Sequence, residues 1–167
     1  MLNFKQKLNK ITTLMFDVDG VMTDGKVLVM ESGEMVRNMN SKDGYAIHLA
    51  VQKAFRIVII SGGNNNAVKN ALERTGVKDV FINQHDKLAC YLDYLKLNNL
   101  KDEEVLFMGD DLPDHEIMSR VAWPFVLRMQ LLILNRSANM FLIRMVVKVV
   151  YGILLNKYCV YKTNGRS

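Results

Sequence analysis

The sequence is poor in the residues on which several classes of protein depend. It holds only two cysteines, Cys90 and Cys159, which cannot form a disulfide framework, so we expect a reducing, cytoplasmic setting. The N-terminal segment lacks a long apolar core followed by small residues and does not resemble a secretory signal. The three histidines, His48, His85 and His115, do not have the spacing of a metal site. With 167 residues, 50% of them hydrophobic, the chain fits one globular domain.

Acidic residues are absent from the end of the chain. The last one is Glu116, and the 51 residues after it contain eight of the 22 basic residues. The first 116 residues carry a net charge of −3, although the whole chain carries +5, so its charge gives no reason to expect a nucleic-acid partner. The apolar run at 140–155 contains Arg144 and Lys148 and is shorter than the roughly 20 residues of a membrane span, so no membrane partner is expected either.

Short β-rich runs alternate with helical patterns over the first 122 residues. This order predicts an α/β fold with a parallel sheet. Four strands are expected, at 12–16, 56–60, 80–82 and 105–108. Between them we expect a β-hairpin at 26–39, a helix capped by Asp43, and helices at 64–75 and 87–97.

Polar residues follow every expected strand. In chain order they are Asp17 and Asp19, Ser61 and Gly62, Lys87, and Asp110, Asp111 and Asp114. Ligand sites in open parallel sheets lie beyond the carboxyl ends of the strands, so these residues should converge on one crevice. Asp17 and Asp19 are two apart at a strand end and point the same way, and such a pair of charges requires a divalent cation or a shared proton.

The set has the groups needed for phosphoryl transfer. Asp17, Asp110 and the backbone carbonyl of Asp19 offer the oxygen ligands that Mg²⁺ prefers. Asp17 would be the nucleophile that forms an aspartyl-phosphate, and Asp19 would protonate the leaving alcohol and later deprotonate water. The phosphate oxygens would be bound by Ser61, the amides beside Gly62, and Lys87.

Each of these segments also has a structural explanation. Asp19 and Gly20 fit a turn, 61–63 fits a strand-to-helix turn, Lys87 fits a solvated surface charge, and 109–114 fits a loop with a helix cap. The joint order of the four segments favours the chemical interpretation over these alternatives.

The four segments resemble, in order, the four motifs of the haloacid dehalogenase superfamily of phosphohydrolases. Over roughly residues 8–124 the closer similarity is to its capless 3-deoxy-D-manno-octulosonate 8-phosphate phosphatases. The resemblance implies a Rossmann-like sheet with helices on both faces, Mg²⁺ dependence, a homotetramer, a sugar-acid phosphate substrate and a role in lipopolysaccharide precursor synthesis. It also implies these roles: Asp17 as nucleophile, Asp19 as acid/base, Ser61, Gly62, Lys87 and Asp114 around phosphate and substrate, and Asp17, Asp19 and Asp110 around the metal.

The spacing of the motifs leaves no room for a cap domain. The 36 residues between Asp24 and Ser61 are used by the hairpin, one helix and one strand, so a neighbouring subunit is the expected cover. Gly63 and Arg74 resemble the eight-carbon enzymes, whereas some relatives that act on a nine-carbon sialic-type acid have Glu in place of Gly63. Three alternatives stay open: a nine-carbon phosphatase, a non-catalytic oligomerisation or regulatory module of the same fold, and a phosphoacceptor switch resembling a receiver domain.

The resemblance ends near Pro124, so we divide the chain into a phosphatase domain at 1–124 and an atypical basic, apolar tail at 125–167. The family's Pro-Ala-Asp-Ala segment and Gly-rich stretch are absent from the tail. A slip of one base after Pro124 would restore both: the single Met codon forces Ala after Met129 and Gly after Met145. The alternative is a genuine divergent terminus with a basic amphipathic helix.

Overall fold

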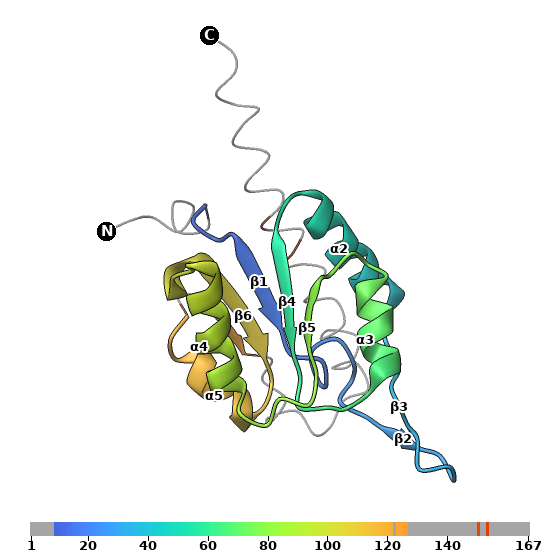
Figure 1. Cartoon of the computed structure of the whole chain (residues 1–167). Coiled ribbons are helices and arrows are strands. Elements are labelled where there is room, and N and C mark those ends of the chain that lie inside the picture. Colours follow the sequence, from blue (N-terminus) through green and yellow to red (C-terminus); the bar gives the residue numbers. More distant parts are fainter. Residues whose placement is uncertain (1–8, 122, 127–149, 151–152, 154–167) are drawn as a thin grey trace.

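A five-stranded parallel sheet forms the centre of the fold (Figure 1). The structure, a computed structural model, describes residues 9–121, 123–126, 150 and 153. The strands are β1 (Thr13–Phe16), β4 (Arg56–Ile60), β5 (Asp79–Phe81), β6 (Val105–Gly109) and β7 (Trp123–Val126). Their spatial order is β5-β4-β1-β6-β7, which places β1 in the middle. The carboxyl end of β1 therefore lies at the centre of the sheet edge.

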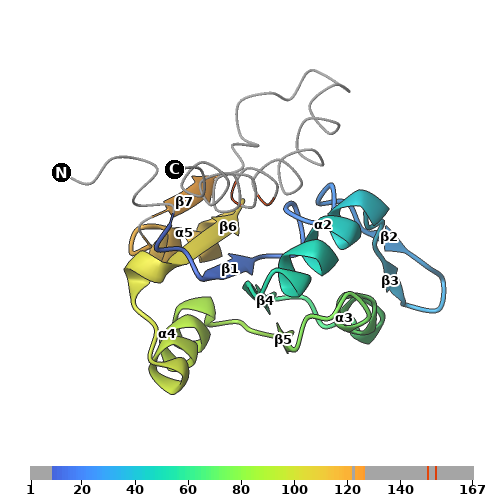
Figure 2. The same ribbon diagram turned by 90° about the horizontal axis from the view of Figure 1, so that it is seen from above.

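The sheet has a separate hydrophobic core on each face, because alternate side chains of a strand point to opposite faces. Leu14 and Phe16 belong to the core under α2 (Ser41–Gln52) and α3 (Asn66–Glu73). Met15 belongs to the core under α4 (Lys87–Asn98) and α5 (Leu112–Met118). Figure 2 shows α2 and α4 on opposite sides of the sheet. The predicted α/β fold with helices on both faces is confirmed.

A small antiparallel hairpin projects from the body (Figure 1). It consists of β2 (Leu28–Val29) and β3 (Met35–Val36), with Leu28 opposite Val36. The hairpin was expected at 26–39, and its strands are shorter because they pair only with each other. The side chains on both strands are exposed, so this apolar element has no core of its own within the described chain.

Local signals explain where several elements begin. Asn65 caps α3: its side-chain oxygen accepts hydrogen bonds from the backbone amides of Ala67 and Val68. The prediction that Asp43 caps α2 is wrong, because Asn40 accepts from the amide of Lys42 and the helix begins two residues before Asp43. Asp43 lies in the first turn instead, where a carboxylate favours the helix dipole.

Two further elements were not predicted. They are a short 3₁₀ helix, η1 (Asp102–Glu104), which precedes β6, and the strand β7, which extends to Val126; the domain boundary at 124 stays a prediction. Val150 and Ile153 pack in the core under α2 and α3. The rest of the 125–167 tail lies outside the described residues. Among the helices of the described chain, none has the length and apolarity needed to cross a bilayer.

Candidate active site

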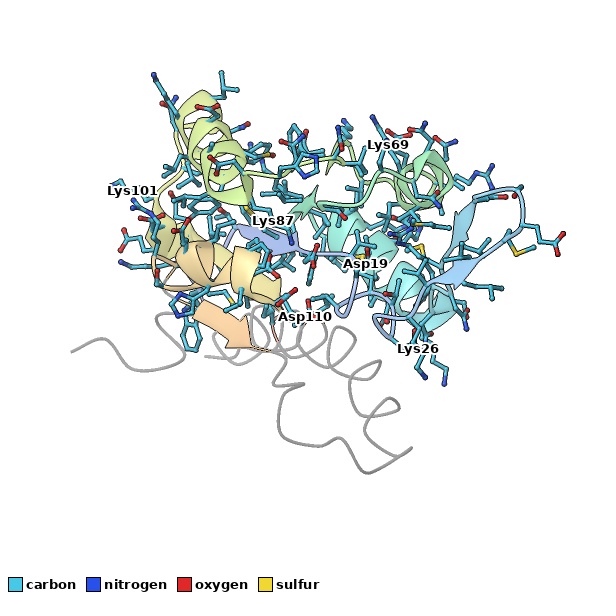
Figure 3. The ribbon with its side chains drawn as sticks, turned by 90° about the horizontal axis from the view of Figure 1, so that it is seen from below. Asp19, Lys26, Lys69, Lys87, Lys101 and Asp110 are labelled. Carbon is cyan, nitrogen blue, oxygen red and sulfur yellow. The ribbon has the colours of Figure 1, made fainter. Side chains whose placement is uncertain are left out.

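A cleft of about 510 Å³ lies at the carboxyl edge of the sheet. Groups from all four expected strand ends line it, together with Gly25 from the loop before the hairpin: Asp17, Asp19, Gly25, Ser61, Gly62, Gly63, Lys87, Asp110, Asp111 and Pro113. Figure 3 looks onto this edge, with Asp19, Lys87 and Asp110 near the middle and Lys26, Lys69 and Lys101 at the periphery. The prediction that these strand ends converge is confirmed, and the role of each residue remains a prediction.

Asp17 is held rigidly at the end of β1. Its backbone amide donates to the carbonyl of Met108 at 3.0 Å, which continues the pairing of β1 with β6. The chain then turns sharply through Gly20, whose φ is +82°. A Cβ at Gly20 would lie 1.8 Å from Oδ2 of Asp110, so only glycine lets this loop approach the Asp110 carboxylate.

Lys87 is a buried bridge between two carboxylates and is not a solvated charge. It is the first residue of α4, which is capped by Asp86. Its ammonium lies 3.0 Å from Oδ1 of Asp17 and 2.8 Å from Oδ1 of Asp114. The side chain is only 7% exposed, so these interactions take place largely away from water.

Three carboxylates gather beside this lysine. Oxygens of Asp17, Asp110 and Asp114 lie within 4.8 Å of one another. Asp114 is completely buried, and its Oδ2 accepts from the backbone amide of Asp110 at 3.2 Å. Since both Asp114 oxygens already have donors, its position favours support of Lys87 and Asp110 over direct contact with a substrate.

The cluster carries more negative charge than Lys87 can balance. Burial, opposed by Lys87 and reinforced by Asp114, raises the pKa of Asp17 from 3.8 to about 7. Burial and the neighbouring Asp114 and Asp111 raise the pKa of Asp110 to about 6. Burial alone would lower the pKa of Lys87, but the charge of Asp17 and the hydrogen bond to Asp114 raise it. The oxygen-only donor set and its excess charge fit a hard divalent cation such as Mg²⁺.

The loop after β4 supplies neutral hydrogen-bonding groups. The backbone amide of Ser61 donates to the carbonyl of Phe81 at 2.9 Å, which holds the loop against β5. Its hydroxyl accepts from the amide of Gly63 at 3.1 Å, and Ser61 itself is 4% exposed. Ser61, Gly62 and Gly63 all line the cleft, together with the carboxylates that follow β1 and β6.

Arg37 is a member of the site that the sequence analysis missed. It follows β3, and its Nε and Nη2 donate to the two carboxylate oxygens of Asp19 at 2.7 and 3.0 Å. The hydrogen bonds to Asp19 raise the pKa of Arg37. The side chain of Asp19 is thus engaged by Arg37, and the predicted contact of its backbone carbonyl with a metal stays a prediction. Eighteen residues separate the pair, and no motif spacing could have indicated it.

No family model matches the sequence, but several individual proteins are similar to it. It is 32% identical over 116 residues to the 3-deoxy-D-manno-octulosonate 8-phosphate phosphatase of Yersinia pestis, which covers 70% of this chain and 62% of that protein. The Escherichia coli K12 protein of the same name is 32% identical over 115 residues, with 69% and 61% covered. The chain therefore matches less than two thirds of the length of these curated relatives.

Solved structures resemble the fold closely. The crystal structure of the Yersinia pestis phosphatase has a TM-score of 0.78 and 28% identity, covering 92% of this chain and 85% of that one. The Moraxella catarrhalis phosphatase, solved with a magnesium ion, a phosphate ion and a KDO molecule, has a TM-score of 0.77 and 19% identity, covering 95% and 96%. At that identity the likeness is one of fold.

Proposed function

Because the chain belongs to the capless 3-deoxy-D-manno-octulosonate 8-phosphate phosphatase family of the haloacid dehalogenase superfamily, we propose that it is a phosphoric monoester hydrolase acting on that sugar-acid phosphate. One observation carries the proposal above all others. Asp17 and Asp110 lie in one cleft with Ser61 and Lys87, which is the set that the chemistry requires. The activity would serve lipopolysaccharide precursor synthesis in the cytoplasm.

The reaction begins with attack by Asp17 on phosphorus. The Asp17 carboxylate forms a bond to the phosphorus atom as the bond to the sugar oxygen breaks, giving an aspartyl-phosphate. Mg²⁺, held by Asp17, Asp110 and the Asp19 carbonyl, would offset the repulsion between the carboxylate and the phosphate. Lys87 and the Ser61 hydroxyl hold the phosphate oxygens, and the buried position of Lys87 strengthens its interaction with them.

Asp19 transfers protons to the departing sugar oxygen and from the attacking water. Its carboxyl protonates the departing sugar oxygen, and the resulting carboxylate then takes a proton from the water that hydrolyses the aspartyl-phosphate. Its side chain is 35% exposed in the cleft, so it is open to a sugar and to water. Asp17 is regenerated, and inorganic phosphate leaves.

We also propose that the protein assembles as a homotetramer through its hairpin. Leu28 and Val29 are each 64% exposed and Met35 is 51% exposed, so the hairpin presents large apolar side chains to solvent. A second copy of the same chain is the occupant that the family resemblance implies. Because the described chain has no cap domain, a neighbouring subunit would also restrict the access of water to the cleft.

A further proposal concerns the tail: we infer that residues 125–167 arise from a slip of one base after Pro124. Its support is the complete lack of acidic residues after Glu116, the two forced codons, and a match to curated relatives that extends over 116 residues. Sequencing the encoding DNA tests it, and an unbroken frame at Pro124 in independent isolates would contradict it.

Phosphate release tests the function directly. We expect turnover of 3-deoxy-D-manno-octulosonate 8-phosphate that requires Mg²⁺ and falls by about 10⁴-fold or more in Asp17→Asn, because the amide is not a nucleophile. A screen should include a nine-carbon sialic-type acid phosphate and a frame-restored version of the chain. Preference for the nine-carbon acid would correct the substrate. Mg²⁺ binding without turnover of any sugar phosphate would instead favour a non-catalytic module.

A further inference from the structure

Arg37 and Asp19 form an ion pair with two hydrogen bonds. The guanidinium meets the carboxylate along one edge, with Nε to Oδ1 at 2.7 Å and Nη2 to Oδ2 at 3.0 Å. This two-point geometry fixes the orientation of the carboxylate as well as its place. The side chain of Arg37 is 8% exposed, compared with 35% for Asp19, so the guanidinium lies behind the carboxylate and Asp19 faces the cleft.

Each of the three guanidinium nitrogens of Arg37 donates one hydrogen bond to the protein. Its third nitrogen, Nη1, donates to the carbonyl of Met35 at 3.3 Å. All three guanidinium nitrogens therefore have protein acceptors. Three of its five N–H groups are thus engaged by the protein, and the two that remain, one on Nη1 and one on Nη2, make direct contact with a substrate the alternative to a positioning role.

The backbone carbonyl that accepts from Nη1 of Arg37 is itself held by a second hydrogen bond. The Met35 carbonyl also accepts from Nδ2 of Asn65 at 2.8 Å, and Asn65 is the residue that caps α3. The base of the hairpin is thereby tied to the N-terminus of that helix. Gly63 leaves space for the pair: a Cβ there would lie 3.2 Å from Nη2 of Arg37 and 3.4 Å from Oδ2 of Asp19.

We infer that Arg37 is a positioning residue that orients the Asp19 carboxylate for its two proton transfers, with the Asn65–Met35 contact holding Arg37 in place. The inference rests on the proposed function. Orientation matters because a proton-transfer group misplaced by about 1 Å loses on the order of 100-fold in rate.

The test is a comparison of Arg37→Gln in two backgrounds. In the wild-type background we expect kcat to fall by about 10- to 100-fold with KM changed by less than about threefold, since Arg37 acts through Asp19. In an Asp19→Ala background the same change should have less than about a twofold effect, because the group it orients is gone. Arg37→Lys should restore part of kcat, and Lys26→Gln, which also removes one positive charge but at an exposed site, should leave kcat unchanged.

Two outcomes would overturn the inference. One is a rise in KM in both backgrounds, which identifies Arg37 as a direct substrate ligand. The other is an equal loss of kcat with and without the Asp19 carboxylate. If the wild-type chain shows no turnover, the proposed function fails. The contact between Arg37 and Asp19 is then tested by unfolding alone, and additive losses of stability for Arg37→Gln and Asp19→Ala would show that the two side chains are not coupled and would overturn the inference.

Discussion

Replacing Asp17 by asparagine removes a titrating carboxyl from the core of the cleft with little change of shape. The pKa of Asp17 is about 7 in the folded chain and 3.8 in the unfolded chain. Between pH 3.8 and pH 7 the Asp17 carboxyl is protonated in the folded state and ionised in the unfolded state. The stabilisation that this proton gives to the folded state is complete below pH 3.8 and is lost as the pH rises through 7.

The magnitude follows from the size of this pKa shift. One pKa unit corresponds to about 1.4 kcal/mol, so the rise from 3.8 to about 7 destabilises the ion-free protein at high pH by about 4 kcal/mol at most. Asp17 is 5% exposed, so solvent screens this effect only weakly. Between pH 5 and pH 8 we expect the stability of the wild type to fall by about 2 to 3 kcal/mol relative to Asp17→Asn.

Urea unfolding in EDTA at several pH values from 5 to 8 measures this difference. Asp93→Asn, which removes an exposed carboxyl from α4, serves as the control and should give a constant difference. Saturating Mg²⁺ should abolish the decline in the wild type, because the cation stabilises the ionised carboxylates. A constant difference between wild type and Asp17→Asn across this range would refute the conclusion that the cluster has an excess of negative charge.

Three further predictions follow from the site and the hairpin. Gly20→Ala should weaken Mg²⁺ binding by about 10-fold in calorimetry, because the new Cβ would clash with Asp110. Gly33→Ala is the control, with the same φ of +82° and no atom within 4 Å, and should bind Mg²⁺ normally. Equal losses of Mg²⁺ affinity in the two variants would contradict the role of the close approach of Gly20 to Asp110. Lys87→Met should cost about 3 to 5 kcal/mol of unfolding free energy in EDTA, since it leaves buried carboxylates unpaired; a loss below about 1 kcal/mol would refute the buried ion pair. Leu28→Lys should lower the sedimentation coefficient without lowering stability, because this side chain is 64% exposed; an unchanged coefficient would exclude the hairpin as the interface.

The strands and the cleft could be predicted because they depend on local patterns. A parallel sheet aligns its carboxyl ends, so Asp17, Ser61, Lys87 and Asp110 had to meet once their strands were assigned. The burial of Lys87 was not evident from its sequence position, since a lysine in the first turn of a helix is commonly solvated. Its two carboxylate partners are Asp17, which follows β1, and Asp114, which lies in α5, and no local pattern reports them.

The misses share a physical cause. Arg37 follows β3 and meets Asp19, 18 residues earlier in the chain, only through the tertiary fold, and no local pattern in the sequence reports such a contact. Asn40 and Asp43 are both good helix-capping residues, and the choice between them depends on where the chain leaves the hairpin. The strand β7 is four residues long and contains Pro124, which weakens any strand signal.

The place of β1 in the sheet has a consequence for synthesis of the chain. Thr13 pairs with Arg56 on one side and with Val105 on the other, and the amide of Asp17 is bonded to the carbonyl of Met108. During synthesis, Asp17, the proposed nucleophile, therefore emerges from the ribosome about ninety residues before β6, the strand that holds it in place. Until β6 emerges, the apolar β1 is unpaired on that side, and this growing polypeptide is most prone to aggregation in that interval.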